Sequence, residues 1–134
     1  MYKRQAEELL GRPYTFSGKV VYGNQLGRTI GIPTANLWMP KQRLPVQGVF
    51  AVKCKLVDKH LYGIANMGTR PTVDGESPVL EVHLFDFDQN IYGQRLEIEF
   101  IKKIRDERKF DNINLLKQQI HKDIDIAKDT LKLI

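Results

Sequence analysis

The sequence predicts a mainly β fold, a six-stranded antiparallel β-barrel of the Greek-key type with a C-terminal amphipathic α-helix packed on it. Short stretches that alternate apolar and polar side chains, separated by turn residues, fill most of the chain. Near the C-terminus the apolar residues instead recur every three or four positions, which is typical of one face of a helix. The length of 134 residues suits a single domain, and the 42% of hydrophobic residues suits a packed core.

The N-terminal part predicts a lead-in followed by the first strand. Residues 1–13 favour a short helical lead-in or linker that stops at Gly11, and the barrel domain is expected over residues 14–134. Residues 17–22 are rich in β-forming side chains. The polar loop that follows contains three glycines at four-residue spacing, Gly23, Gly27 and Gly31.

The middle of the chain predicts two paired strands and a loop. Residues 49–56 alternate well enough to form a half-buried strand, in which Cys54 lies on the core face. Residues 58–60 favour a turn into a second strand at 61–66. Residues 67–78 contain two glycines and two prolines, which predicts a loop.

Two more strands and a helix complete the expected fold. In residues 79–87 alternate side chains point to opposite faces, with Leu80, Val82 and Leu84 on one face and Glu81, His83 and Phe85 on the other. After a turn, residues 91–104 form the returning strand. Asp111 is the expected N-cap of the helix. The helix presents one apolar stripe, formed by Ile113, Leu116, Ile120, Ile124, Ala127, Leu131 and Ile134.

Charge and cysteine content limit the function classes. Twenty-one basic and sixteen acidic residues give a formal charge of +5, which favours anionic ligands without choosing among nucleotides, flavin phosphates and nucleic acids. Residues 102–109 concentrate five basic side chains, either as an anion site or as a solvated strand end. The single cysteine excludes an intramolecular disulfide. Because the sequence shows neither a membrane span nor a signal peptide, we expect no membrane partner and a cytoplasmic location.

A hydroxyl and an amide two residues apart form the first candidate site. In residues 31–36 the side chains of Thr34 and Asn36 would project from the same side of an extended segment. Such neutral oxygens suit a Mg²⁺ ion already bound to phosphates, although Zn²⁺ and Mn²⁺ would also accept them. The upstream glycines, together with Arg28, could fold over the phosphates. From these residues alone, a turn capped by Thr and Asn is the simpler interpretation.

An ordered set of motifs resembles the riboflavin kinase family across nearly the whole chain. The glycine loop and its surroundings match the nucleotide-binding signature of that family, Gly18-Lys-Val-Val-x-Gly23 and Leu26-Gly-Arg-Thr-Ile-Gly-Ile-Pro-Thr-Ala-Asn36. The likeness continues in order through Gly48-Val-Phe, Asn66-Met-Gly-Thr-Arg-Pro-Thr72, Glu81-Val-His-Leu, Tyr92-Gly93 and Ile104-Arg-Asp-Glu-x-x-Phe110. The resemblance implies transfer of the γ-phosphoryl group of ATP to riboflavin, which gives FMN and ADP.

The resemblance implies roles for five residues on the nucleotide side. Thr34 and Asn36 would ligate Mg²⁺ and meet the ATP phosphates. Gly23 and Arg28 would belong to the loop that covers the nucleotide. Tyr92 would lie near the adenosine part of ATP.

On the flavin side the resemblance implies a catalytic base and a binding segment. Glu81 matches the catalytic carboxylate of the family. Arg105, Arg108 and Phe110 match the segment that contacts the flavin, although Arg108 agrees with the pattern only in its basic character. From periodicity alone, Glu81 is an ordinary outward-facing residue of a half-buried strand.

Two function classes without catalysis are the alternatives. A nucleic-acid-binding barrel would suit the charge, but the aromatic side chains do not gather on one strand face as base stacking requires, so we expect no nucleic-acid partner. An FMN-binding barrel would hold the flavin and ignore ATP. The P-loop and the H-R-D catalytic loop are absent from the sequence, which excludes the common kinase architectures as templates.

Residues 6–13 resemble the linker that joins this domain to an FMN adenylyltransferase domain in bacterial relatives. Nothing before Tyr14 could supply that upstream domain. We therefore expect this sequence to be the excised C-terminal module of a bifunctional FAD-synthesising protein, with Met1 added to it.

Overall fold

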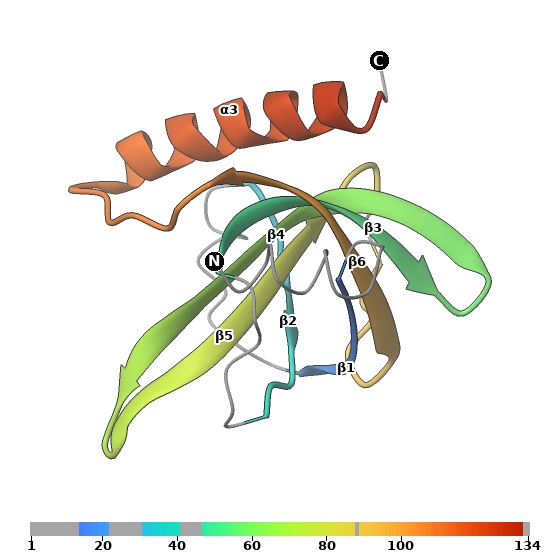
Figure 1. The fold of residues 1–134 in the computed structure, drawn as a ribbon, viewed down its shortest axis with the longest axis horizontal. Coiled ribbons are helices and arrows are strands. Elements are labelled where there is room, and N and C mark those ends of the chain that lie inside the picture. The colour runs from blue at the N-terminus through green and yellow to red at the C-terminus, as the bar shows by residue number, and fades with distance from the viewer. Residues whose placement is uncertain (1–13, 22–30, 41–46, 88, 133–134) are drawn as a thin grey trace.

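Six strands form a closed barrel, and one helix crosses its outside (Figure 1). The computed structural model describes residues 14–21, 31–40, 47–87 and 89–132. The barrel order is β1-β2-β5-β4-β3-β6, and every pair of neighbours is antiparallel. The elements are β1 (Thr15–Val21), β2 (Ala35–Leu37), β3 (Gly48–Leu56), β4 (Lys59–Thr72), β5 (Gly75–Leu84), β6 (Arg95–Arg105) and α3 (Ile113–Thr130). The predicted fold class is confirmed, whereas the lead-in expected at residues 1–13 lies outside the described residues.

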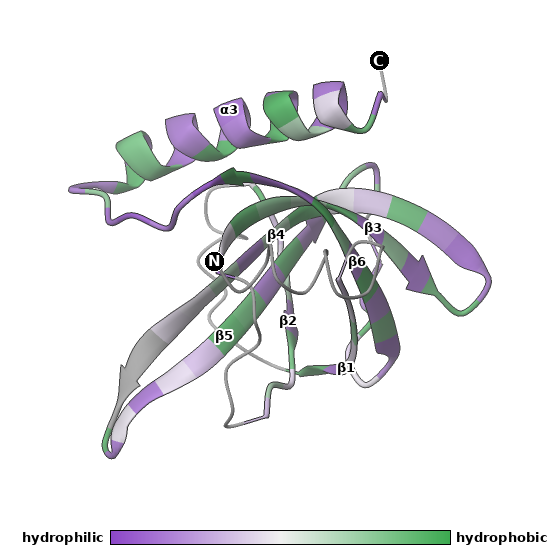
Figure 2. Ribbon diagram, viewed as in Figure 1, coloured by the Kyte–Doolittle hydropathy of each residue, from purple (hydrophilic) through white to green (hydrophobic). Residues whose placement is uncertain are grey.

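The interior is filled by the inward faces of the strands. Phe50 and Phe100 are fully buried and meet edge to face, with ring centroids 5.2 Å apart. Cys54 lies in the same cluster, as predicted, and burial raises the pKa of its thiol to about 12. The thiol is therefore protonated and unreactive at neutral pH. Hydrophobic and hydrophilic residues alternate along the second half of β3 and the first half of β6 (Figure 2), because each strand has one face inside the barrel; the first five residues of β3 are all buried.

The expectation of a loop at residues 67–78 is wrong. β4 continues to Thr72 and pairs with β5 from Gly75 onward. Beyond Met67, β4 no longer pairs with β3. The hairpin therefore projects from the barrel as a two-stranded ribbon (Figure 1), in which a proline removes no hydrogen bond to a third strand. The glycines and prolines that indicated a loop are tolerated for this reason.

The turn between β5 and β6 is longer than the alternation predicts. β5 ends at Leu84 rather than at residue 87, and β6 begins at Arg95 rather than at residue 91. Between them Asp86 has a φ of 53° just after β5 and Gly93 has a φ of 84° just before β6, and these left-handed backbone conformations interrupt the extended run. Leu80, Val82 and Leu84 nevertheless share one buried face of β5, as the alternation predicts.

The helix α3 packs its apolar stripe against the outside of the barrel, mainly on β3, β4 and β6. Its N-cap is Asn112 rather than the expected Asp111, because the Asn112 side chain accepts the backbone N–H of Leu115 at 2.9 Å. Ile113 is 48% exposed and lies outside the stripe, and Ile134 lies outside the described residues. No helix in the described parts of the chain has the length and apolar character that crossing a bilayer requires. The stripe contacts a second hydrophobic cluster on the barrel through Ile120, Ile124, Ala127 and Leu131.

Candidate functional site

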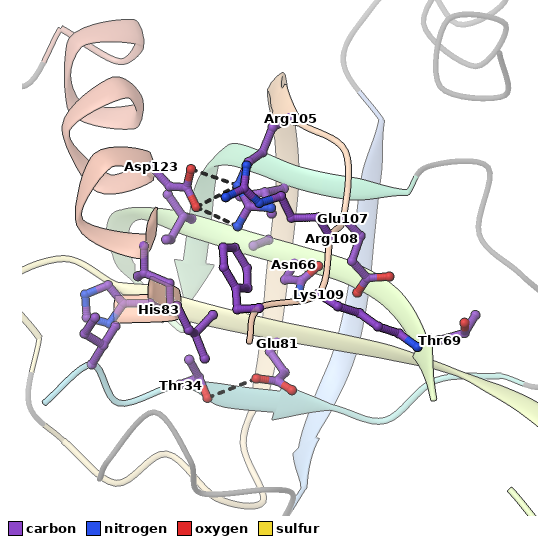
Figure 3. Close-up of a pocket in the computed structure, with 17 residues that line it drawn as sticks. Thr34, Asn66, Thr69, Glu81, His83, Arg105, Glu107, Arg108, Lys109 and Asp123 are labelled. Atoms are coloured by element: carbon purple, nitrogen blue, oxygen red, sulfur yellow. Dashed lines mark hydrogen bonds and ion pairs between the residues drawn. The ribbon is translucent and has the colours of Figure 1, made fainter. Parts of the chain in front are cut away.

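A cavity of about 480 Å³ lies between the outer face of the barrel, the helix α3 and residues 106–112, which we call the β6–α3 segment. A cavity of this size suits a small organic ligand. Figure 3 shows polar side chains reaching it from the strands, from the segment and from the helix. The polar residues that line it are Thr34, Asn66, Thr69, Glu81, His83, Arg105, Glu107, Arg108, Lys109 and Asp123.

Glu81 lies in the middle of a row of polar residues that crosses three strands. Its register partners are Asn36 on β2 and Asn66 on β4. Because the neighbours of Glu81 along β5 are buried in the core, the alternation of the strand directs Glu81 to the outer face. The hydroxyl of Thr34 donates a long hydrogen bond of 3.5 Å to the Glu81 carboxylate. The barrel wall thus presents a carboxylate next to a hydroxyl on the cavity side.

A buried ion pair lies at the other end of the cavity (Figure 3). Asp123 on α3 is 1% exposed and accepts hydrogen bonds from Nε of Arg105 at 3.0 Å and from Nη2 at 2.9 Å. The Gln119 amide donates to the same carboxylate at 3.0 Å. Nη1 of Arg105 donates to the backbone carbonyl of Asp106 at 3.0 Å. Since a charge at this depth must be paired and hydrogen-bonded, these contacts tie α3 to the beginning of the β6–α3 segment.

Two guanidinium groups lie over the ring of Phe110. Cζ of Arg108 is 4.8 Å from the ring centroid, and Cζ of Arg105 is 5.7 Å from it, both within cation–π range. The ring is partly buried and lines the cavity together with both arginines. The β6–α3 segment therefore offers an aromatic surface with cationic donors beside it.

The β6–α3 segment also lies close against β4. A Cβ on Gly68 would collide with the carboxylate of Glu107, so the absence of a side chain permits this approach. At the start of the segment Asp106 forms an ion pair with Lys103. The hydrogen bond and charge of Lys103 hold the pKa of the Asp106 carboxyl below its ordinary value of 3.8. These contacts hold the segment near the barrel.

The structure brings most of the predicted site residues together. Asn36 lies on the same outer face as Thr34, but it is only 9% exposed and does not line the cavity. The predicted residues that do line the cavity are Thr34, Glu81, Arg105, Arg108 and Phe110. Their proximity agrees with a shared site, whereas the role of each residue stays a prediction.

Tyr92, a third described residue predicted for the nucleotide side, does not line the cavity. Tyr92 is 47% exposed in the turn between β5 and β6. The N–H of Gly93 donates to the carbonyl of Val20 at 2.9 Å, which fixes this turn beside the last part of β1. In sequence, β1 ends directly before the glycine loop, and Gly23 and Arg28 in that loop lie outside the described residues.

Sequence reasoning missed several cavity residues. Asn66 ends the expected strand and Thr69 falls in the expected loop, so alternation gave no reason to select them. Asp123 did carry a signal, because it interrupts the apolar stripe between Ile120 and Ala127. A charged residue on the buried face of a helix indicates a buried partner. That partner, Arg105, is 18 residues away in the chain, so spacing alone does not identify it.

The oxygen atoms around Glu81 fit the Mg²⁺ ion that the resemblance implies. Among the described residues, no three His, Cys, Asp or Glu side chains lie close enough together to hold a metal by themselves. The Thr34 hydroxyl lies beside a carboxylate, and the Asn36 amide lies opposite it in register. Hard oxygens of this kind suit Mg²⁺, which keeps several waters and takes further ligands from substrate phosphates.

The chain is similar to proteins of one family along most of its length. The sequence model of the Flavokinase family, described as riboflavin kinase, matches residues 10–131. The bifunctional riboflavin kinase/FMN adenylyltransferase of Haemophilus influenzae is 56% identical over 124 residues, which cover 92% of this chain and 40% of that protein. The Bacillus subtilis protein of the same name is 45% identical over 122 residues, which cover 88% of this chain and 39% of that protein. The chain thus spans about two fifths of the length of these relatives.

Two solved structures share the fold. A Streptococcus pneumoniae protein described as a macrolide-efflux protein has a TM-score of 0.84 at 38% identity, covering 94% of this chain and 42% of its own. The riboflavin kinase of Trypanosoma brucei has a TM-score of 0.64 at 22% identity, covering 90% of this chain and 81% of its own, which supports the fold alone. The match of the family model over residues 10–131 and the identity of 56% to a named relative agree with the ordered motifs. The chain belongs to the riboflavin kinase family.

Proposed function

We propose that the chain is a riboflavin kinase domain, which transfers the γ-phosphoryl group of ATP to the ribityl 5′-hydroxyl of riboflavin and releases FMN and ADP. The observation that carries this proposal is that Thr34, Glu81 and the pair formed by Arg108 and Phe110 line one cavity. Membership of the riboflavin kinase family supports the same reaction.

Glu81 is the proposed general base. A primary alcohol is a poor nucleophile until a base accepts its proton. Glu81 is partly buried on a strand of the closed barrel, and one of its oxygens accepts from Thr34. As the hydroxyl oxygen bonds to the γ-phosphorus, its proton passes to Glu81. The bond from that phosphorus to the bridging oxygen breaks, and ADP leaves with the electron pair.

Thr34 and Asn36 are the residues that would hold Mg²⁺ together with the ATP phosphates. When bound, the ion offsets negative charge on the phosphoryl group in transfer. Thr34 would also orient the proposed base, because its hydroxyl contacts the Glu81 carboxylate. A single residue would therefore join the metal side of the site to the base. Mn²⁺ or Zn²⁺ would find the same oxygens.

Gly23, Arg28 and Tyr92 complete the proposed ATP side. Gly23 and Arg28 would cover the phosphates, the glycine because backbone can approach a ligand closely there and the arginine because it pairs with phosphate oxygens. The exposed ring of Tyr92 offers a surface for the adenosine part.

Phe110 and its flanking arginines form the proposed flavin side. The ring of Phe110 offers a stacking surface for the planar isoalloxazine. Arg108 lies over this ring, so flavin would bind beside its guanidinium or replace it there. Arg105 donates to Asp123 and to a backbone carbonyl, which leaves it few donors for a ligand. We infer that Arg105 serves the flavin mainly by holding the β6–α3 segment.

We further propose that this domain works beside an FMN adenylyltransferase domain in a longer protein. The named relatives are bifunctional, and this chain matches about two fifths of each. Such a protein would convert riboflavin to FMN in this domain and FMN to FAD in the other. A cytoplasmic location, where ATP is abundant, stays the prediction from sequence.

The test is to incubate the chain with riboflavin and Mg·ATP and to separate the flavins by chromatography. We expect FMN and ADP in equal amounts, and no FMN when the metal is removed with a chelator. Binding of FMN with indifference to ATP would instead favour the FMN-binding barrel. No binding of either substrate, with salt-dependent retention of single-stranded oligonucleotides, would favour a nucleic-acid-binding barrel.

A further inference from the structure

The backbone pairing between β2 and β5 ends one residue short of Thr34. The last register pair is Ala35 with Val82, and the same register would set Thr34 opposite His83. Pro33 has no N–H and so has no donor for β5. The residues that lead into β2 therefore need another connection to the barrel wall if Thr34 is to keep a defined position.

His83 supplies that connection through its side chain. Its Nδ1 lies 2.8 Å from the carbonyl oxygen of Pro33. Since a carbonyl oxygen only accepts, Nδ1 must carry the proton, and Nε2 of the neutral ring is then free of hydrogen. The ring also packs edge to face on Phe85, with centroids 5.9 Å apart. Two contacts at different points of the imidazole thus hold its orientation.

We propose that His83 is a positioning residue for the reaction, and this rests on the proposed function. The contacts form a closed path. Nδ1–H of His83 donates to the carbonyl oxygen of Pro33. Thr34, which follows Pro33 in the chain, donates to Glu81. Glu81 and His83 are two positions apart on the same face of β5, which closes the path. His83 thereby sets the distance between the Thr34 hydroxyl and the Glu81 carboxylate.

A direct contact between His83 and a substrate is the competing interpretation, because His83 lines the cavity. The two interpretations use different ring nitrogens. The tether uses Nδ1–H as a donor, whereas a substrate contact would use Nε2. Asparagine carries an amide nitrogen near the position of Nδ1, and glutamine carries one near the position of Nε2. Substituting each of them separates the two roles.

The experiment compares His83→Leu, His83→Asn and His83→Gln by steady-state kinetics with each substrate varied. We expect His83→Leu to raise KM for Mg·ATP about tenfold, the factor that corresponds to one hydrogen bond of ordinary net strength, with KM for riboflavin nearly unchanged. His83→Asn should recover most of this loss, and His83→Gln should resemble His83→Leu. His60→Asn, at an exposed position outside the cavity, is the matched control and should behave as the unchanged chain.

Three kinetic results would overturn the proposal. The first is unchanged kinetics in His83→Leu. The second is recovery of the KM for Mg·ATP in His83→Gln rather than in His83→Asn. The third is an equal rise of KM for both substrates in His83→Leu, accompanied by a lower Tm. A readout without turnover is the ¹⁵N spectrum of the imidazole: Nδ1–H as the main neutral form supports the tether, and Nε2–H contradicts it. If the unchanged chain makes no FMN, the proposed function fails separately, while the ¹⁵N result still decides whether the tether exists.

Discussion

The two faces of β5 differ in what surrounds them. On the inner face Leu80, Val82 and Leu84 are at most 5% exposed and lie in a closed barrel. On the outer face Glu81 and His83 are only partly buried, because α3 and the β6–α3 segment cover that side incompletely and leave the cavity. The same backbone therefore supports a packed core on one side and a polar site on the other.

Because of this difference, we expect residues on the inner face to determine stability and residues on the outer face to determine binding and turnover. Contacts on the inner face are apolar and depend on volume, so a substitution there changes the free energy of unfolding. Contacts on the outer face are single polar pairs such as Thr34 with Glu81 and His83 with Pro33, which depend on geometry. Substitutions there should change binding or turnover and leave stability almost unaffected.

The largest expected effect comes from the outer face. Glu81→Gln should lower kcat by about 10²–10⁴, because the amide does not accept the proton of the attacking hydroxyl. The free energy of unfolding should stay within about 0.5 kcal/mol of the unchanged chain, since the side chain keeps its shape and partial exposure. Turnover by product chromatography and urea unfolding measure the two quantities. Full turnover in this variant would refute the role of Glu81 as base.

The converse substitution lies on the inner face. Phe100→Ala removes a fully buried ring that contacts Phe50 and Tyr14, and it should lower the free energy of unfolding by about 3–5 kcal/mol. The folded fraction should retain nearly normal KM values for both substrates, measured at low temperature where the variant is still folded. A selective loss of one substrate would show that the faces are coupled more tightly than we infer.

Substituting the ion pair between Arg105 and Asp123 tests whether Arg105 contributes to stability or to flavin binding. Asp123→Asn should destabilise the fold by about 3 kcal/mol, because the partly buried guanidinium of Arg105 loses its anionic partner. The double variant Arg105→Met with Asp123→Leu should recover much of this stability, since an apolar pair needs no charge partner. If the double variant is stable and binds riboflavin normally, Arg105 acts through the fold and not by touching the flavin. Normal stability of Asp123→Asn alone would contradict the inferred tie.

The smallest effect is expected at the metal side. Thr34→Ala should raise KM for Mg·ATP about tenfold with little effect on riboflavin, because it removes the proposed ligand oxygen and the hydrogen bond to Glu81. Asn36→Ala should act in the same direction. Raising the Mg²⁺ concentration should restore part of the activity in both variants. An equal weakening of both substrates would indicate misfolding instead of a lost ligand.

The inferred site could be predicted from sequence only in part. Alternation in β5 directed Glu81 away from the core, and the resemblance to riboflavin kinases selected it among other outward carboxylates. The structure adds that Thr34 lies next to it, although 47 residues separate the two in the chain. Asn66 was missed because its position in the site depends on register with Glu81, a property of strand pairing rather than of local composition.

The sequence by itself determined which residues of β5 share the core face and that a helical period replaces the alternation near the C-terminus, because both follow from neighbouring residues and water. Only the tertiary structure decided where β4 ends, which residue caps α3 and which carboxylate pairs with Arg105. These features depend on contacts between distant parts of the chain. A proline is harmless in a two-stranded hairpin, and a buried aspartate is stable only when folding brings an arginine to it.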